Sequence, residues 1–344
     1  MSKSSRTRTI ACVTVSLALA GSLAACSGGS KKVAATTPPS TTAAPSPSPA
    51  KTSAPPVKAV NPFTGAAPSK NGVVAVKIDD TAPGRPQVNI DKADVVFVEQ
   101  VEGGLTRLLG IYNTTLPTVE AVRSVRTSDP ELVSQFGPIA FVASGGGGDS
   151  LPTLDHSSLK ASINDRGGPG FSRDGNRPAP YNLTSNLGAV VSALKAPKAR
   201  SIGWTFGALP AAVPSGLHLN TVVGATPVTF NWDAKLGRYA RLIDGVVQHA
   251  ADGATISTPN VIVQFCTVVP HPGDVDVAGN VAQYTHTVGK GRVVVYRNGH
   301  QISGTWSRLS TSSGTRLVDK AGKPIPLAQG GAWVLLVATN APLS

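Results

Sequence analysis

The order of hydrophobic and polar residues predicts short strands along most of the chain. Residues Val73–Ile78 are almost entirely apolar and are followed by two aspartates, a pattern typical of a buried strand that ends in a turn. The segments 94–101 and 106–112 are also rich in apolar residues, and the Glu-Gly-Gly sequence between them favours a tight reversal. These two segments therefore predict a β-hairpin.

A short helix is predicted after the hairpin. The sequence Ser128-Asp129-Pro130-Glu131 has the spacing of a capping box and places a proline in the first turn. We expect the helix that it opens to end near Phe136.

Four consecutive glycines at 145–148 follow a further predicted strand, Ile139–Ala143. The run lacks the Lys-Ser/Thr pair that ends a P-loop, and its spacing differs from that of dinucleotide-binding motifs. It predicts a flexible turn. The alternative is a nest of backbone N–H groups for an anion.

After residue 205 the pattern changes to strands and turns without a long helical period. The clearest strand signals are Val228–Trp232, Val261–Val269, Gly291–Arg297 and Trp333–Ala338. Aromatic residues make up only 5% of the chain, whereas it has 36 glycines and 28 prolines, which also favours strands and loops. We expect an α+β fold, with a mixed α/β N-terminal domain over residues 61–205 and a β-rich C-terminal domain over residues 206–344. The pattern also allows one core shared by both.

Residues 1–25 have the three parts of a secretory signal peptide: a basic start, an apolar run and small residues before a cleavage point. The apolar run, Ile10–Leu23, is shorter than the roughly twenty residues that span a bilayer. Leu23-Ala24-Ala25-Cys26 resembles the lipobox of bacterial lipoproteins, in which the cysteine receives acyl chains such as palmitate. The resemblance implies lipidation at Cys26 and a membrane-anchored protein on the extracytoplasmic face. An ordinary signal peptide with a chance cysteine is the alternative.

Residues 26–60 consist mainly of Ser, Thr, Ala, Pro and Lys. Such a composition cannot bury a core, so the segment is predicted to be a disordered tether with extended polyproline character. At ~3.1 Å per residue its full reach is on the order of 100 Å. This length suits a spacer between a membrane and a folded domain.

The net charge of +12 is unevenly distributed along the chain. No acidic residue precedes Asp79, and residues 61–344 carry 24 basic and 19 acidic side chains, a net charge of +5. The basic residues of this region are interleaved with acids rather than gathered in runs. The sequence therefore predicts no nucleic-acid partner.

Cysteine and histidine usage predicts neither disulfides nor a metal centre. Cys266 is the only cysteine after residue 60 and lies in an apolar run, so it is expected to be a buried small side chain. The six histidines have no spacing typical of metal ligands. No cofactor is expected.

Several sequence blocks resemble the YerB-like lipoproteins of Gram-positive bacteria, along nearly all of residues 61–344. The blocks are Asn61-Pro-Phe-Thr-Gly65, Gly84-Arg-Pro-Gln87, Ala93-Asp94, Glu102-Gly-Gly-Leu-Thr-Arg107, Val122-Arg-Ser-Val-Arg126, Pro180-Tyr-Asn-Leu183, Trp232, Asn260-Val-Ile-Val-Gln264, Gly304-Thr-Trp-Ser307 and Gly331-Ala-Trp333. The resemblance implies a lipoprotein with a two-part fold and does not imply a reaction.

Three arginines stand close to the predicted helix start and make up a candidate anion-binding site. Arg107 begins the second strand of the hairpin, whereas Arg123 and Arg126 precede Ser128, where free backbone N–H groups and the helix dipole favour an anion. The planar guanidinium group suits phosphate or carboxylate. The alternative is internal pairing. In that case Arg107 would pair with Glu99 or Glu102, and Arg123 with Glu120 or Asp129.

An enzymatic interpretation is also open. The segment Ser124-Val125-Arg126 is distantly similar to one in the LytR-CpsA-Psr phosphotransferases, which hold a polyprenyl pyrophosphate with arginines and a metal with aspartates. That similarity implies a divalent metal and acids drawn from Asp79, Asp80 and Asp94, with Glu102 as a further candidate. As structural residues, these acids would belong to strand ends and turns.

We expect a lipoprotein that binds an anionic cell-envelope component, either a wall polymer or a polyprenyl-phosphate precursor, without chemistry of its own. A metal-dependent phosphotransferase or hydrolase acting on a lipid-linked glycan is the second hypothesis. The third is a structural, partner-binding lipoprotein. No catalytic residue is assigned.

Overall fold

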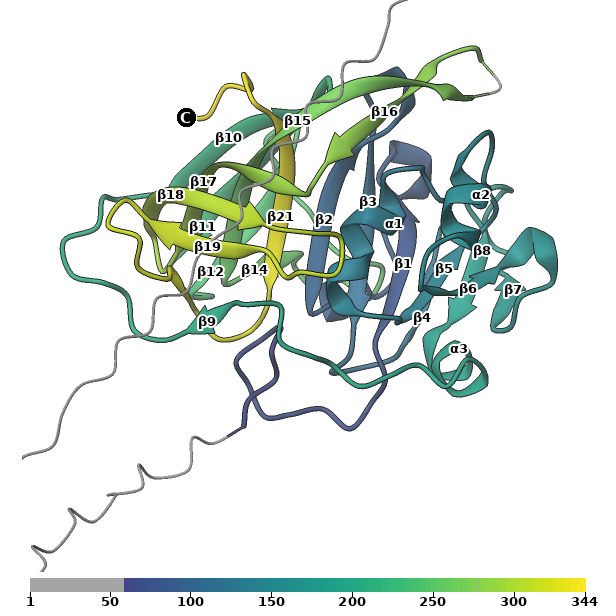
Figure 1. Ribbon diagram of the computed structural model, residues 1–344, viewed down its shortest axis with the longest axis horizontal. Coiled ribbons are helices and arrows are strands. Elements are labelled where there is room, and N and C mark those ends of the chain that lie inside the picture. Colours follow the sequence, from purple (N-terminus) through teal and green to yellow (C-terminus); the bar gives the residue numbers. More distant parts are fainter. Residues whose placement is uncertain (1–58, 277) are drawn as a thin grey trace, which may run out of the picture. The chain divides into compact units, whose positions relative to one another are not determined.

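A mixed sheet of eleven strands contains residues from both halves of the sequence (Figure 1). The computed structural model describes residues 59–276 and 278–344. The expected signal peptide, Cys26 and the tether up to residue 58 lie outside the described residues. The α+β fold is confirmed, since strands dominate and the few helices are short.

The order of the central sheet is β19-β18-β17-β15-β21-β2-β3-β1-β5-β6, and β16 pairs with β15 beside this path. Its strands in chain order are β1 (Val74–Asp79), β2 (Val95–Gln100), β3 (Thr106–Tyr112), β5 (Ala140–Ala143), β6 (Lys160–Ile163), β15 (Asn260–Val275), β16 (Val281–His286), β17 (Gly289–Arg297), β18 (His300–Arg308), β19 (Arg316–Asp319) and β21 (Ala332–Ala338).

The last strand of the chain joins the two halves of this sheet. β21 pairs in parallel with β2 on one side and with β15 on the other. The expected boundary at residues 205 and 206 therefore separates two regions of sequence that share one sheet.

Alternation along the strands produces two cores, one on each face of the sheet. Val74 and Val76 of β1 belong to one core, whereas Ala75 between them belongs to the other. Each core also takes residues from the second half, such as Val261 on the first face and Ile262 on the second.

Smaller elements cover both faces. A five-stranded sheet packs on the face of Val74, where Phe230 meets Trp333 edge to face at 5.6 Å between ring centroids. It consists of β10 (His218–Val223), β11 (Thr226–Asp233), β12 (Arg238–Ile243), β13 (Val246–Val247) and β14 (Ser257–Thr258). Helix α3 (Leu187–Ala193) packs on the same face. Two further small sheets are formed by β4 (Thr118–Glu120), β7 (Phe171–Arg173) and β8 (Leu183–Asn186), and by β9 (Thr205–Phe206) and β20 (Pro326–Leu327).

The opposite face carries α1 (Asp129–Val133) and α2 (Ser150–Asp155). A 3-10 helix, η4 (Ser134–Phe136), continues α1, and the Phe136 ring contacts the Phe63 ring at 5.3 Å between centroids. The remaining 3-10 helices are η1 (Ala82–Gly84), η2 (Ile90–Lys92), η3 (Glu102–Gly104) and η5 (Asn164–Arg166).

The local predictions have mixed outcomes. The hairpin is confirmed, because β2 and β3 pair antiparallel and Gly103 and Gly104 take positive φ values of 63° and 72° in the turn. Burial of Cys266 is also confirmed, and burial raises the pKa of its thiol to about 12.

The prediction of a capping box at Ser128 is wrong. Ser128 has helical backbone angles and makes no side-chain cap, and Glu131 bonds instead to Thr287, Val288 and Tyr284.

Candidate functional site

A cleft of about 400 Å³ opens where β1, β2 and β5 end. β1 is parallel to β5, and both β1 and β2 are antiparallel to β3, so all three strands end at the same edge of the sheet. This edge is where open α/β sheets usually bind ligands. The cleft is lined by Asp79, Thr81, Val101, Glu102, Leu105, Thr106, Arg107, Arg123, Ser124, Arg126, Gly147, Ser150, Tyr181, Asp274, Val275 and Asp276.

The three predicted arginines all line this cleft, and Arg107 is the one without a partner. It stands opposite Asp79 and Glu99 in the strand register, but those carboxylates pair with other side chains. Within the described chain its Nη1 atom is buried and makes no hydrogen bond. Burial, and then the neighbouring Arg126 and Arg123, lower the pKa of Arg107 to about 10. The guanidinium group stays charged at neutral pH but lies in an environment that disfavours its charge.

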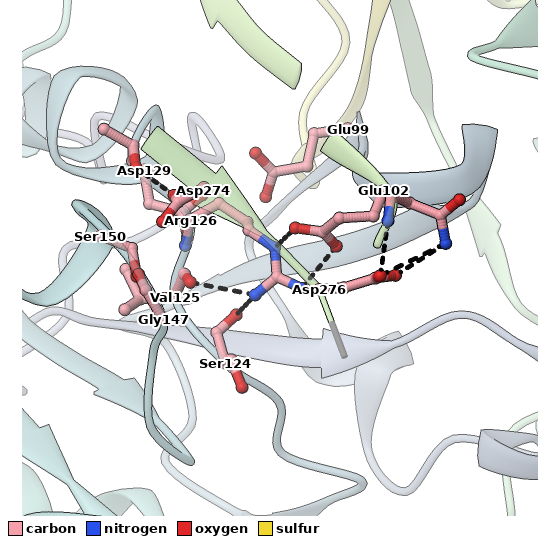
Figure 2. Close-up of polar contacts among 12 residues, drawn as sticks. Glu99, Glu102, Ser124, Val125, Arg126, Asp129, Gly147, Ser150, Asp274 and Asp276 are labelled. Atoms are coloured by element: carbon pink, nitrogen blue, oxygen red, sulfur yellow. Dashed lines mark hydrogen bonds and ion pairs between the residues drawn. The ribbon is translucent and has the colours of Figure 1, made fainter. Parts of the chain in front are cut away.

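Arg126 is neutralised within the protein (Figure 2). Its Nη2 donates to Oε2 of Glu102 at 2.6 Å, and its Nε lies 2.5 Å from Oε1 of the same carboxylate. Its Nη1 donates to the carbonyl of Val125 at 3.1 Å. Arg126 therefore forms a bidentate ion pair with Glu102 in the lining of the cleft.

Arg123 occupies an intermediate position. Its Nη1 lies 3.4 Å from Oδ2 of Asp79, and its guanidinium carbon lies 5.3 Å from the centroid of the Tyr181 ring. Asp79 also accepts hydrogen bonds from the backbone and side chain of Thr81. The Arg123 side chain is 20% exposed, so this loose ion pair remains accessible from the cleft.

The alternative of internal pairing predicted specific partners for Arg107 and Arg123, and the structure does not show those pairs. Glu99 pairs with Lys77 rather than with Arg107, and Glu120 lies 3.5 Å from Arg177. Of the four acids named in that alternative, Glu102 forms an ion pair with an arginine of the cluster, but its partner is Arg126, and Arg123 pairs with Asp79 instead.

Asp80 and Ser128 lie outside the cleft. Asp80 follows Asp79 and therefore points to the other face, where it pairs with both terminal nitrogens of Arg241 at 2.9 and 2.7 Å and accepts from Thr106 at 2.8 Å. Ser128 is buried and does not line the cleft. Asp79 and Asp80 thus diverge rather than converge on a common ligand.

Two acidic residues of the cleft were missed by the sequence analysis. Asp274 and Asp276 come from the long β15–β16 hairpin, which extends past the rest of the sheet (Figure 1). Neither belongs to a motif, and the strand predicted over Val261–Val269 continues in the structure to Val275. Two aspartates separated by one residue at the tip of a strand were the available signal.

A buried charged cluster lies behind Arg126. Lys77 bonds to Glu99 and, at 2.7 Å, to Asp129, and all three side chains are at most 2% exposed. The other oxygen of Asp129 accepts the backbone N–H of Arg126 at 2.7 Å. Burial and the Asp129 carboxylate raise the pKa of Glu99. This cluster fixes the backbone that carries Arg126.

In the described part of the chain, these acids do not form a metal-binding cluster. In residues 59–276 and 278–344, no three side chains of His, Cys, Asp or Glu gather as ligands for a metal ion. Asp94 lies elsewhere and accepts the backbone N–H groups of Asn113 and Thr114 at 2.6 and 2.8 Å. The cleft therefore brings together three arginines of the first half of the chain with two aspartates of the β15–β16 hairpin.

Comparison with known proteins identifies the family. Residues 63–200 match the family described as "Protein of unknown function (DUF3048) N-terminal domain", and residues 218–334 match its C-terminal domain. The chain belongs to this family. It is 26% identical over 282 residues to "Putative lipoprotein YerB" of Bacillus subtilis, covering 77% of this chain and 80% of that protein.

A solved structure shows the same fold. The crystal structure of the YerB protein from Bacillus subtilis matches with a TM-score of 0.71 and 22% sequence identity, over 83% of this chain and 100% of that one. The resemblance to YerB-like lipoproteins is confirmed, and the relative supports lipoprotein status and membrane association for this chain. Among the described residues, no helix has the length and apolar composition that crossing a membrane requires.

Proposed function

We propose that this protein is a membrane-anchored lipoprotein on the extracytoplasmic face and that its cleft binds the anionic group of a cell-envelope component. The observation that carries the proposal is the unpartnered guanidinium group of Arg107 in a cleft at the strand ends. Protein interiors rarely leave a desolvated charged donor without a partner. A ligand that supplies the missing oxygen would relieve that cost.

The energetics suit a ligand of moderate affinity. One charged hydrogen bond contributes about 1.5–3 kcal/mol. Arg107 offers its unpaired fork, and Arg123 is able to exchange its 3.4 Å contact with Asp79 for a closer one with the ligand. After the cost of association, two such contacts give dissociation constants on the order of micromolar to millimolar.

The sequence around Cys26 supports the cellular setting of the proposal. The lipobox-like sequence and the tether predict an acylated N-terminus, and the similarity to a protein named as a lipoprotein agrees with it. A cleft carried on such a tether meets wall polymers and lipid-linked precursors, which are rich in phosphate and carboxylate groups. The ligand class follows from the arginines, and the location follows from the anchor.

Binding is tested on the full chain purified in detergent, by calorimetric titration with inorganic phosphate, pyrophosphate and soluble muropeptides. At least one probe should bind, and Arg107→Gln should weaken it at least tenfold. Arg316→Gln is the matched control, because it removes the same charge from an exposed position. Equal affinities of the Arg107→Gln variant and the control, or no binding of any probe, would contradict the proposal.

The anchor is tested separately in cells. A Cys26→Ser variant should move from the membrane fraction to the soluble fraction, whereas Cys12→Ser should remain with the membrane. Retention of the Cys26→Ser variant in the membrane would exclude lipid anchoring at this residue.

A further inference from the structure

The cleft contains a second unpartnered group, with a charge opposite to that of Arg107. Asp274 is 4% exposed, and its Oδ2 atom accepts a hydrogen bond from the Thr127 hydroxyl. Its Oδ1 atom is buried and has no hydrogen-bond partner among the described residues. A buried carboxylate oxygen without a donor is as costly as a buried guanidinium nitrogen without an acceptor.

These two groups do not satisfy each other. Asp274 forms no ion pair within the described chain, and its position at the end of β15 places it on the hairpin side of the cleft. Arg107 belongs to β3, near the start of that strand. The two charged groups are therefore carried by different elements, the central part of the sheet and the β15–β16 hairpin, and no ion pair joins them in the described chain.

The other charged side chains of the cleft already have partners within the described chain. Arg126 is neutralised by Glu102, and Arg123 lies beside Asp79. Asp276 accepts a hydrogen bond from the Asn280 side chain at 3.0 Å and from the backbone N–H groups of Asn280 and Ala278 at 2.9 Å each, and these bonds lower its pKa. What remains for a ligand is one cationic group and one anionic group.

We propose that the ligand of this cleft is a zwitterion of peptide size, with its acidic group on Arg107 and a protonated amine on Asp274. This inference rests on the anion-binding function proposed above and narrows it. A simple anion would satisfy Arg107 but would leave Asp274 unpaired and would be repelled by it. A molecule that carries both an acid and an amine removes both desolvation costs at once.

The small number of oxygen atoms available at Asp274 favours an ammonium group over a divalent cation. One of its oxygens is occupied by Thr127, which leaves a single free oxygen, whereas calcium takes six to eight oxygen ligands. An ammonium group needs only a few acceptors. Thr81, Ser124 and Ser150, which carry hydroxyl groups, also line the cleft. The volume of about 400 Å³ lies within the range of small-ligand pockets and suits a short peptide or an amino-sugar acid.

The test uses the full chain in detergent and three simple zwitterions of increasing length: alanine, dialanine and trialanine. At least one should bind to the wild-type chain, and its N-acetylated and C-amidated forms should each bind at least tenfold more weakly. Asp274→Asn keeps the bond to Thr127 available and should reduce the affinity of the zwitterion to that of its N-acetylated form. Asp155→Asn, an exposed aspartate paired with Arg166, is the matched control and should change nothing.

The outcomes separate this inference from the function on which it rests. If N-acetylated peptides or phosphate bind as tightly as the zwitterion and still depend on Arg107, the anion-binding function stands and the zwitterion is excluded. If calcium or magnesium is required for binding and Asp274→Asn abolishes that requirement, the cationic partner is a metal and the amine is excluded. If no probe binds in an Arg107-dependent manner, both proposals fail.

Discussion

The two faces of the central sheet treat neighbouring aspartates in opposite ways. Asp80 points to the face covered by the five-stranded sheet, where Arg241, Thr106 and Gln87 all donate to its carboxylate. Asp79, one residue earlier, points to the cleft and shares a loose ion pair with Arg123. On the first face, the charged groups are paired within the protein. On the second face, charged groups of the cleft remain available to a ligand.

This difference teaches how to separate structural charges from ligand-binding charges. The Asp80–Arg241 pair joins the residue that follows β1 in the first half to β12 in the second, and both side chains are almost fully buried. Arg107 and Asp274 also come from the two halves but remain unpaired. Among charged residues of similar burial, those without a hydrogen-bonding partner in the protein are the candidates for binding a ligand.

The largest effect is expected for Arg241→Ala on the closed face. It leaves the Asp80 carboxylate buried without a cation, a change that typically costs about 3–5 kcal/mol of unfolding free energy. Urea unfolding of the purified chain measures it. The control is Arg166→Ala, which breaks an equally direct but exposed pair with Asp155 and should leave stability unchanged. A loss for Arg241→Ala no larger than that of the control would remove the distinction between the faces.

A pH-dependent effect is expected for the cluster of Lys77, Glu99 and Asp129 behind the cleft. The pKa of Glu99 is raised in the folded state, so folding favours its protonated form. The resulting stability is present below the unfolded pKa of about 4.5 and is lost as the pH rises towards the folded value of about 8. We expect the unfolding free energy to fall across this window by on the order of 1 kcal/mol or more.

The variant Glu99→Gln isolates this effect, because glutamine does not titrate. Its unfolding free energy should depend less on pH between about pH 5 and pH 8 than that of the wild-type chain. Urea unfolding at a series of pH values measures the slope. An unchanged slope would show that another group dominates in this range.

A smaller effect, of opposite sign, is expected for the unpartnered charges on the open face. Arg107→Gln and Asp274→Asn each remove a desolvated charge, so the ligand-free protein should be as stable as the wild type or more stable by up to about 1 kcal/mol. The same urea unfolding assay applies. A loss of more than about 2 kcal/mol for either variant would mean that the group is part of the scaffold.

The last comparison concerns the starts of the helices on the two faces. On the closed face, the Asn186 side chain caps α3 by accepting the backbone N–H of Ala189 at 2.9 Å, so Asn186→Ala should cost about 1 kcal/mol. Ser128 makes no such bond at α1, so Ser128→Ala should cost much less. Equal losses for the two variants would restore the capping role that the sequence suggested for Ser128.

Much of the fold was predictable because strand periodicity is a local property. The hairpin of β2 and β3 and the strands β1, β5 and β21 follow directly from apolar runs and glycine turns. The order of the sheet was not predictable, since the pairing of β21 with β2 joins residues that are far apart in sequence and leaves no local signal.

The candidate site was predictable only in part for the same reason. Arg107, Arg123 and Arg126 stand near one another in sequence, and the structure places all three at one cleft. Asp274 reaches that cleft from the second half, through a strand longer than the sequence suggested. The capping box failed because Glu131 finds stronger partners in Thr287 and Val288, which only the tertiary fold brings close.

The central position of β21 in the sheet has a consequence for how the chain folds during synthesis. A polypeptide made from its N-terminus cannot complete the central sheet until β21, Ala332–Ala338, is available to fill the gap between β2 and β15. Until then the edges of both strands stay open, a state prone to mispairing with other chains. Removal of residues 332–344 should therefore unfold the described parts of both halves of the sequence.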